Sequence, residues 1–281
     1  MENWQIITIL LIISCLIFNE AIQNLDDKRM CQFEKGTTRK AAENGNLELL
    51  KYAYENECKW DEDTTIVAAA KGNLECLQYA HENGCEWNED TTRAAAANGH
   101  LKCLKYAHEN KCPWDESTTE AAANYGSLEC LKYAYENGCK WNIIDIANNA
   151  ILKDNLEILK YIHENGYKLN ILTTNTAAVR GNLEILKYLH ENKCPWDEST
   201  AQIATYNGYF KFLKYAHENG CKWDEDTTTV AAKRGKLKIL KYAHKNGCPW
   251  DENLTKEAAS NGKLKCLKLF RLLLVTILEQ C

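Results

Sequence analysis

The sequence of 281 residues has only three prolines and no tract rich in serine and glycine, so it offers no obvious linker between separate domains. No segment alternates apolar and polar residues as a half-buried strand does, which argues against a β-sheet. The net charge of −5 is spread over residues of both signs, whereas a nucleic-acid surface needs a basic stripe. Gly-rich phosphate loops, nucleophile elbows and other enzyme motifs are also missing. These absences predict a protein without catalytic residues, without a cofactor and without a nucleic-acid partner.

The main feature that is present is a repeat of 27 residues. Tryptophans recur at this spacing, with one gap of 55 residues between Trp141 and Trp196, where Tyr167 and Leu169 replace the usual Cys and Trp. A turn residue recurs with the same period, at Gly45, Gly72, Gly99, Gly126, Asp154, Gly181, Gly208, Gly235 and Gly262. Self-similarity at such a period is typical of a stacked array, because no single repeat can bury its own apolar face. We therefore expect one array of about nine repeats.

Each repeat is predicted to consist of a short first helix, a turn, a longer second helix and a tight return. In one second helix, Leu74, Leu77 and Ala80 lie three residues apart and share a face, and Asn83-Gly84 supplies a left-handed stop. Ser117 and Glu120 have the spacing of a capping box. The first helices are expected to begin nine residues before the turn residue, mostly at good N-cap types: Gly36, Asp63, Asp90, Ser117, Asp145, Leu172, Ser199, Asp226 and Asn253. The predicted fold class is an all-α helical repeat solenoid.

The two ends do not follow the repeat, which divides the chain into residues 1–29, an array over residues 36–266 and an apolar end over residues 267–281. The run Trp4–Phe18 is largely apolar over 15 residues, which is shorter than the roughly 20 of a typical membrane-spanning helix. Residues 1–29 are either a membrane anchor or sequence upstream of a true start at Met30. If the run inserts, the basic residues that follow it predict that the array stays in the cytosol.

Fourteen cysteines raise the question of a disulfide framework. The position of Cys76 is occupied by Leu49 and Phe212 in other repeats, so it is an apolar packing position in which cysteine acts as a small hydrophobe. Later repeats, such as the one that contains Cys221, have no second cysteine to pair with. This pattern favours free thiols in a reducing compartment, and therefore a cytoplasmic array.

Histidine and cysteine recur four residues apart, as at His81 and Cys85, and acidic clusters such as Asp61–Asp63 precede the first helices. A zinc site needs four converging ligands, which no repeat supplies, and Tyr54 and Tyr135 replace the histidine in two repeats. Acidic residues at a helix start are stabilised by the helix dipole. We therefore interpret these residues as scaffold and predict no metal site.

The segment Ala68–Glu75 (AAAKGNLE), which leads on to Gly84-Cys85, resembles the ankyrin repeat pattern of two alanines, a glycine, a Glu-containing second helix and Gly-Ala. The resemblance covers residues 36–266, and Gly247–Glu252 is similar to the end of the short repeats found in large DNA viruses of amoebae and in some protists. It implies an ankyrin-like interaction scaffold. Each repeat is shorter than the usual length of about 33 residues, and the deficit lies where ankyrins carry a β-hairpin finger. The resemblance therefore implies an array without long fingers, with any binding surface on the helices and inner turns.

Some positions vary between repeats, in particular the sixth residue before the turn and the two residues directly before it. In an ankyrin-like stack these positions line the concave face, so the resemblance implies that they contact a partner. Because Arg and Tyr are enriched among binding anchors, the candidate partner-binding residues are Arg39, Arg93, Arg180, Tyr206, Arg234 and Lys256. The predicted function is a non-enzymatic, monomeric scaffold that binds a protein partner. The alternative is a membrane-tethered structural repeat protein, or a paralogue with little specific function.

The repeat that follows Trp141 is predicted to be the weak joint of the array. It has one extra residue, expected in the return Asn142–Ile144, it has Asp154 in place of the turn glycine, and the next repeat has Leu172 at the expected N-cap. Local defects add in repeat arrays, so limited proteolysis should cut first between Trp141 and Leu172 and leave two helical halves. First cuts elsewhere in the array would contradict this prediction.

Overall fold

The computed structural model describes residues 36–250 and 253–278. The chain divides into two compact units at the bond between Trp141 and Asn142. We call their described parts the N-terminal half (36–141) and the C-terminal half (142–278). The division falls at the start of the repeat that sequence reasoning singled out as the weak joint.

The prediction of an all-α repeat solenoid is confirmed, because the described residues form nine helix pairs and no strand. In the N-terminal half the pairs are α2 (Thr37–Glu43) and α3 (Leu47–Glu55), α4 (Thr64–Lys71) and α5 (Leu74–Glu82), α6 (Glu89–Ala97) and α7 (Leu101–Glu109), and α8 (Glu116–Asn124) and α9 (Leu128–Glu136). In the C-terminal half they are α10 (Ile143–Leu152) and α11 (Leu156–Glu164), α12 (Ile171–Arg180) and α13 (Leu183–Glu191), α14 (Glu198–Asn207) and α15 (Phe210–Glu218), α16 (Glu225–Arg234) and α17 (Leu237–Lys245), and α18 (Leu254–Ser260) and α19 (Leu264–Leu278).

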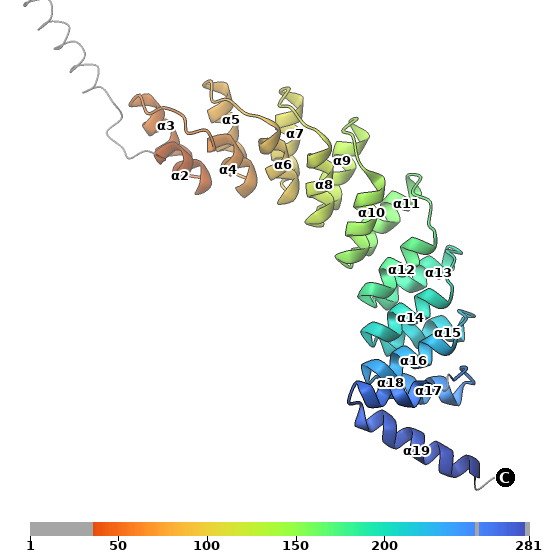
Figure 1. Cartoon of the computed structure of the whole chain (residues 1–281). Coiled ribbons are helices and arrows are strands. Elements are labelled where there is room, and N and C mark those ends of the chain that lie inside the picture. The colour runs from red at the N-terminus through yellow and green to blue at the C-terminus, as the bar shows by residue number, and fades with distance from the viewer. Residues whose placement is uncertain (1–35, 251–252, 279–281) are drawn as a thin grey trace, which may run out of the picture. The chain divides into compact units, whose positions relative to one another are not determined.

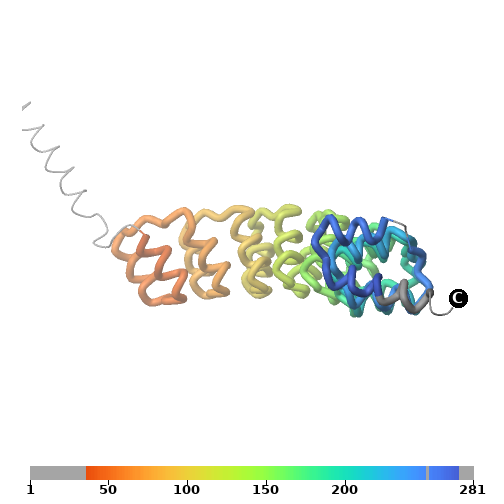
Figure 2. The backbone as a smooth tube through the Cα atoms, turned by 60° about the horizontal axis from the view of Figure 1, so that its bottom comes forward, coloured from red at the N-terminus to blue at the C-terminus, as the bar shows by residue number. Residues whose placement is uncertain are grey.

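Within each half the helices form two rows (Figure 1). The first helices contact one another along one row, from α2 to α8 and from α10 to α18, while the second helices pack against them as the other row. Figure 2 shows the pairs of the N-terminal half lying side by side, each turned little from the last. The apolar end of the sequence from residue 267 continues α19. None of the described helices is both long enough and apolar enough to cross a bilayer, and Trp4–Phe18 lies outside the described residues.

The core runs between the two rows and is built from the positions that repeat most closely. Ala68 and Ala69 of α4 and Leu77 and Ala80 of α5 are completely buried. Glycine is needed at Gly72, in the turn between the two helices, for two reasons. The φ of Gly72 is +74°, and a Cβ added there would lie 2.5 Å from the His100 ring of the next repeat.

The predicted start of the first helix is correct in three repeats, at Gly36, Asp63 and Asn253, and two or three residues late in the other six. In those six, an Asn or Asp directly after the Trp position is the N-cap: Asn88, Asp115, Asn142, Asn170, Asp197 and Asp224. Its side-chain oxygen accepts the N–H of the second or third helical residue, as Asp115 does from Ser117 at 2.9 Å. The capping box expected at Ser117 is therefore wrong, since this residue lies inside the helix.

The return segment is tied down by a threonine that sequence reasoning did not single out. The second threonine of the first helix is buried and donates to a carbonyl of the return that ends its own repeat. The bonds span 2.8–3.2 Å and join Thr65 to Glu86, Thr92 to Pro113, Thr119 to Lys140, Thr174 to Pro195 and Thr228 to Pro249. Two of these hydroxyls also meet a threonine of the next repeat, Thr65 with Thr91 at 3.2 Å and Thr92 with Thr118 at 3.3 Å. These polar side chains thus hold each return against its own repeat.

The irregular repeat is accommodated by changes of its own. The prediction that the extra residue lies in the return Asn142–Ile144 is wrong, because Asn142 is the N-cap and α10 begins at Ile143. The turn residue Asp154 comes 12 residues after this N-cap, whereas Gly99 comes 11 residues after Asn88, so the extra residue lies between the N-cap and the turn. Asp154 adopts φ +58°, and its carboxylate accepts a hydrogen bond from Asn182 at 3.1 Å. In the next repeat, Leu172 is not the N-cap, because Asn170 caps α12 and forms a capping box with Thr173. Tyr167 fills the cysteine position, with its hydroxyl 3.1 Å from the Thr173 hydroxyl.

A pair of isosteric substitutions tests the threonine contacts. Thr92→Val removes a buried hydroxyl that donates to Pro113 and should lower the free energy of unfolding by about 1–2 kcal/mol. Thr205→Val is the control. Thr205 is equally buried, and its hydroxyl has no hydrogen-bond partner among the described residues, so its loss should leave stability unchanged or raise it. Urea denaturation followed by circular dichroism measures both. Equal effects of the two substitutions would show that the Thr92 hydrogen bonds contribute nothing.

Candidate functional site

The recurring histidine and tryptophan lie in an aromatic ladder along the second helices. His81 stacks on Trp87 with ring centroids 3.6 Å apart, and Tyr106 of the next repeat meets both rings edge-on at 6.0 Å. The same arrangement recurs in the triads His108–Trp114–Tyr133 and His217–Trp223–Tyr242. Burial lowers the pKa of His81, so the ring is neutral at pH 7 and suited to stacking. These aromatic side chains therefore form the contacts between neighbouring second helices.

The recurring cysteine also has a structural role. Cys112 is buried, and its thiol donates to the carbonyl of Asn88, the N-cap of the first helix in the same repeat, at 3.3 Å. Equivalent bonds of 3.0–3.3 Å join Cys139 to Asp115, Cys194 to Asn170, Cys221 to Asp197 and Cys248 to Asp224. Ten cysteines are free and buried. Cys58 is disulfide-bonded, so the prediction of free thiols does not hold there, and its partner lies outside the described residues.

Neither metal binding nor thiol chemistry is favoured by this geometry. Among the described residues, no three His, Cys, Asp or Glu side chains come together as metal ligands. A pocket of about 580 Å³ between two returns is lined by Cys85 together with Asp61 and Glu86. Burial raises the pKa of Cys85 to about 12, so at pH 7 its sulfur is a protonated thiol and a poor nucleophile.

The candidate partner-binding residues of the N-terminal half are exposed but occupied by local ion pairs. Arg93 lies 2.6 Å from Asp90 on the same helix, and Arg39 lies 3.8 Å from Asp63 of the next repeat. Surface pairs of this kind contribute little to stability, so both guanidinium groups can exchange partners at low cost.

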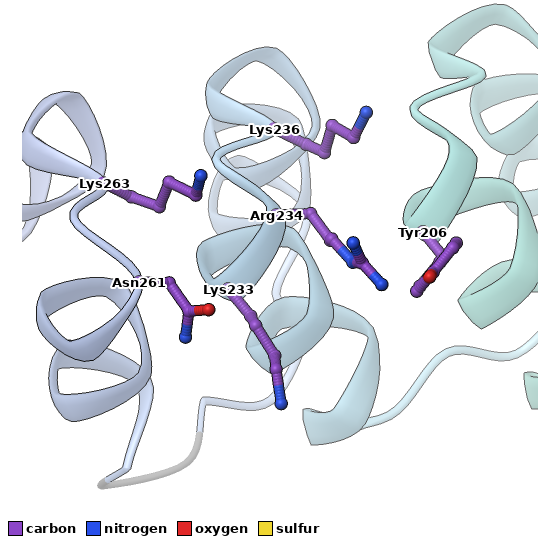
Figure 3. A pocket seen from close by; sticks show the side chains of 6 residues that line it. All are labelled: Tyr206, Lys233, Arg234, Lys236, Asn261 and Lys263. Carbon is purple, nitrogen blue, oxygen red and sulfur yellow. The ribbon is translucent and has the colours of Figure 1, made fainter.

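The candidates of the C-terminal half lie on the first helices α12, α14, α16 and α18. Tyr206 and Arg234 are brought together, since the Arg234 guanidinium carbon lies 3.7 Å from the centre of the Tyr206 ring. Arg180 pairs with Asp154 of the preceding repeat at 3.4 Å, and Lys256 is exposed on α18. Tyr206 and Arg234 also line a pocket of about 450 Å³ with Lys233, Lys236, Asn261 and Lys263 (Figure 3).

A row of exposed apolar side chains was predicted at Tyr206 alone, because the sequence reasoning favoured arginine and tyrosine and missed Leu152 and Val179. Leu152, Val179 and Tyr206 occupy the same position in three consecutive repeats, two residues before the turn, and are 39%, 45% and 50% exposed. We call them the apolar row. Elsewhere this position holds Glu43, Ala70, Ala97, Asn124, Lys233 and Ser260. Packing therefore does not require an apolar residue here. An alignment of the repeats within the sequence shows that three successive repeats have an apolar residue at this position, which could have identified the apolar row.

No family model and no curated protein matches the sequence. Among solved structures, the crystal structure of the human ASB11 ankyrin repeat domain is similar, with a TM-score of 0.48 and 18% sequence identity. The match covers 55% of this chain and 82% of that one. The chain is similar to an ankyrin repeat domain. At this identity the likeness concerns the fold alone.

The buried thiols predict a loss of stability in alkaline solution. Burial raises the pKa of Cys112 and of Cys221 to about 12, above the ordinary value in an unfolded chain. The folded state therefore binds more protons above pH 9, and the stability contributed by each thiol is lost as the pH rises from about 9 towards 12. The slope is about 1 kcal/mol per pH unit for each thiol that ionises only on unfolding.

The measurement is urea denaturation between pH 8 and pH 11. The variant Cys112→Ala with Cys221→Ala should lose stability less steeply with pH than the wild type. The difference in slope should be about 2 kcal/mol per pH unit, since two thiols are removed. Identical slopes for the variant and the wild type would contradict the raised pKa of these two thiols.

Proposed function

We propose that this protein is a non-enzymatic scaffold that binds a protein partner through its row of first helices and the turns that follow them. The observation that carries the proposal is the apolar row of Leu152, Val179 and Tyr206. These side chains lie on helices α10, α12 and α14, which contact one another in order, so the three positions form a continuous stripe.

The apolar row has the properties of a binding surface, and most other repeats hold a polar or charged residue at its position. Apolar side chains that are aligned and partly exposed are typical of protein contact sites. The packing positions of the repeats are filled by buried Ala, Leu, Thr and Cys, whereas the apolar row lies outside this set. A partner that covers these side chains gains the free energy of burying them, about 25 cal/mol for each Å² of apolar surface.

The candidate residues from the sequence fit the same surface. Arg180 directly follows Val179, and Arg234 lies over Tyr206, so polar anchors flank the apolar row on α12 and α16. Tyr and Arg next to an apolar centre are frequent in binding hot spots. We further propose that the chain acts as a monomer in the cytosol. The ten free thiols among the described residues support this compartment, whereas the disulfide of Cys58 counts against it.

A matched pair of variants tests the proposal. Leu152→Gln with Val179→Gln removes two members of the apolar row, and Gln keeps good helix propensity. The control, Ile144→Gln with Leu172→Gln, changes two exposed apolar residues on the same two helices but at their N-terminal ends. Affinity purification of tagged full-length chains, with quantitative mass spectrometry, should show one protein or a small set lost from the first variant and retained by the control.

The proposal fails if the wild-type chain captures nothing reproducible. It also fails if both variants lose the same proteins, or if the first variant loses none. Circular dichroism shows whether each variant is folded, so that a loss of capture is assigned to the surface.

The membrane-tethered alternative depends on Trp4–Phe18. Carbonate extraction of the native chain separates it from the first proposal. A chain that remains with the membrane pellet supports the tether, and a fully extracted chain excludes an integral anchor.

A further inference from the structure

The C-terminal half ends in a concentration of positive charge that the net charge of the chain conceals. Residues 233–271 contain eleven Lys and Arg and three Asp and Glu, although the whole chain has a net charge of −5. Four of these cations line the pocket of about 450 Å³, namely Lys233, Arg234, Lys236 and Lys263. With Tyr206 and Asn261 they form what we call the basic pocket (Figure 3).

The basic pocket lies between successive repeats, on the same side as the apolar row. Arg234 reaches from α16 towards Tyr206 on α14, while Lys236 and Lys263 extend from the residue after each turn towards the preceding repeat (Figure 3). Lys236 Nζ donates to the Asn207 carbonyl at 3.3 Å. The stem of Lys263 packs over Gly235, since a Cβ added to this glycine would lie 3.0 Å from Lys263 Cδ. Tyr206 thus joins the apolar row to the basic pocket.

The structural task of the Lys236 and Lys263 position does not require a charge. In the N-terminal half the same position is held by Asn73, whose amide donates to the carbonyls of Ala42 and Glu43 at 2.8 and 3.1 Å. His100 does the same for the Ala70 carbonyl at 3.1 Å. A neutral side chain therefore caps the end of the preceding first helix equally well. The lysines add charge beyond what the cap needs.

Among the residues that the structure describes, little negative charge offsets these cations. No described acidic side chain lines the pocket, and Lys233 pairs with Glu257 at 3.6 Å. Arg234 stacks on the Tyr206 ring, which orients the guanidinium without pairing it to a carboxylate. Four cations held close together repel one another unless an anionic partner covers them.

We infer that the basic pocket binds an acidic segment of the partner protein, a short run of Asp and Glu side chains laid across α14, α16 and α18. This inference rests on the proposed function and names the chemistry of the partner. A protein segment fits better than single-stranded nucleic acid, because Tyr206 is the one aromatic residue among the described residues that line the pocket and Arg234 lies over one face of its ring, so successive bases have no row of rings on which to stack. A compact pocket with four cations also differs from the extended basic track that a nucleic-acid backbone needs.

The test measures binding of a fluorescein-labelled peptide of six Glu residues alternating with six Gly to the full chain, by fluorescence anisotropy at two salt concentrations. The same peptide with Gln in place of Glu is the neutral control. The variant Lys236→Asn with Lys263→Asn installs the residue that caps the turn at Asn73, so it removes charge while keeping the cap. The wild type should bind the Glu peptide and not the Gln peptide. The variant should bind roughly tenfold more weakly, and added salt should weaken binding.

The matched control removes the same charge elsewhere on the same half. Lys241→Gln with Lys245→Gln changes two exposed lysines of α17 that do not line the pocket. It should bind the Glu peptide within about twofold of the wild type, since charges far from a contact are screened. If it weakens binding as much as the pocket variant, the attraction is general and the inference is overturned.

Three further outcomes would also overturn it. The first is equal binding of the Glu and Gln peptides, and the second is tighter pocket-dependent binding of a single-stranded oligonucleotide of equal charge. The third is a dimer of the free chain in sedimentation velocity that dissociates in the pocket variant, which would assign the pocket to a second copy. None of these decides the proposed function, because partner capture through Leu152 and Val179 is measured separately.

Discussion

The hydrogen bond from a buried first-helix threonine to the return carbonyl is the contact on which the rest of this array depends. A repeat of 27 residues has no β-hairpin finger, so the chain must come back from the second helix to the next first helix within a few residues. Those residues expose carbonyls close to the core, and a buried carbonyl without a donor is costly. Thr65 and its equivalents supply the donor, and the cysteine thiol supplies a second bond to the N-cap carbonyl. Two small polar groups thereby hold the return flat against its own repeat.

With the return held in this way, the residues that stand out in the sequence are used within the scaffold. His, Trp and Tyr form the ladder between second helices, and Cys and Thr fasten the returns. The first helices pack mainly through buried alanine and threonine, with Ile146 and Ile151 added in α10, and the position two residues before the turn lies outside this set. The position of Leu152 and Val179 accepts Glu, Ala, Asn, Lys and Ser in other repeats. Freedom from packing allows these positions to be used for recognition.

Periodicity was sufficient to predict the fold class, the nine helix pairs, the glycine turns and the packing role of the cysteines. It failed where two residues compete for one local role. Asp115 and Ser117 are both good N-cap types, and only the extended backbone at Asp115 shows which of them caps α8. The extra residue of the irregular repeat was likewise placed in the return, since the sequence does not show that α10 can lengthen by one residue. The candidate surface was predicted in part, because residue preference pointed to Tyr206 and Arg234 and passed over the aliphatic Leu152 and Val179. Comparing the repeats shows an apolar residue at this position in three successive repeats, and the structure adds that these side chains are exposed.

The apolar row and the basic pocket share Tyr206, so a partner that covers one reaches the other, and the two would contribute differently to binding. When a partner buries the half-exposed side chains of the apolar row, the burial stabilises the complex and therefore slows its dissociation. Exposed cations act over about a Debye length, so they speed the encounter and select a partner by its charge, but they add less to affinity in salt. Arg234 is the exception, since Tyr206 already orients its guanidinium and less side-chain freedom is lost when an anion binds. In the proposed complex, the lysines of the C-terminal half would select an acidic partner, and Leu152, Val179 and Tyr206 would hold it.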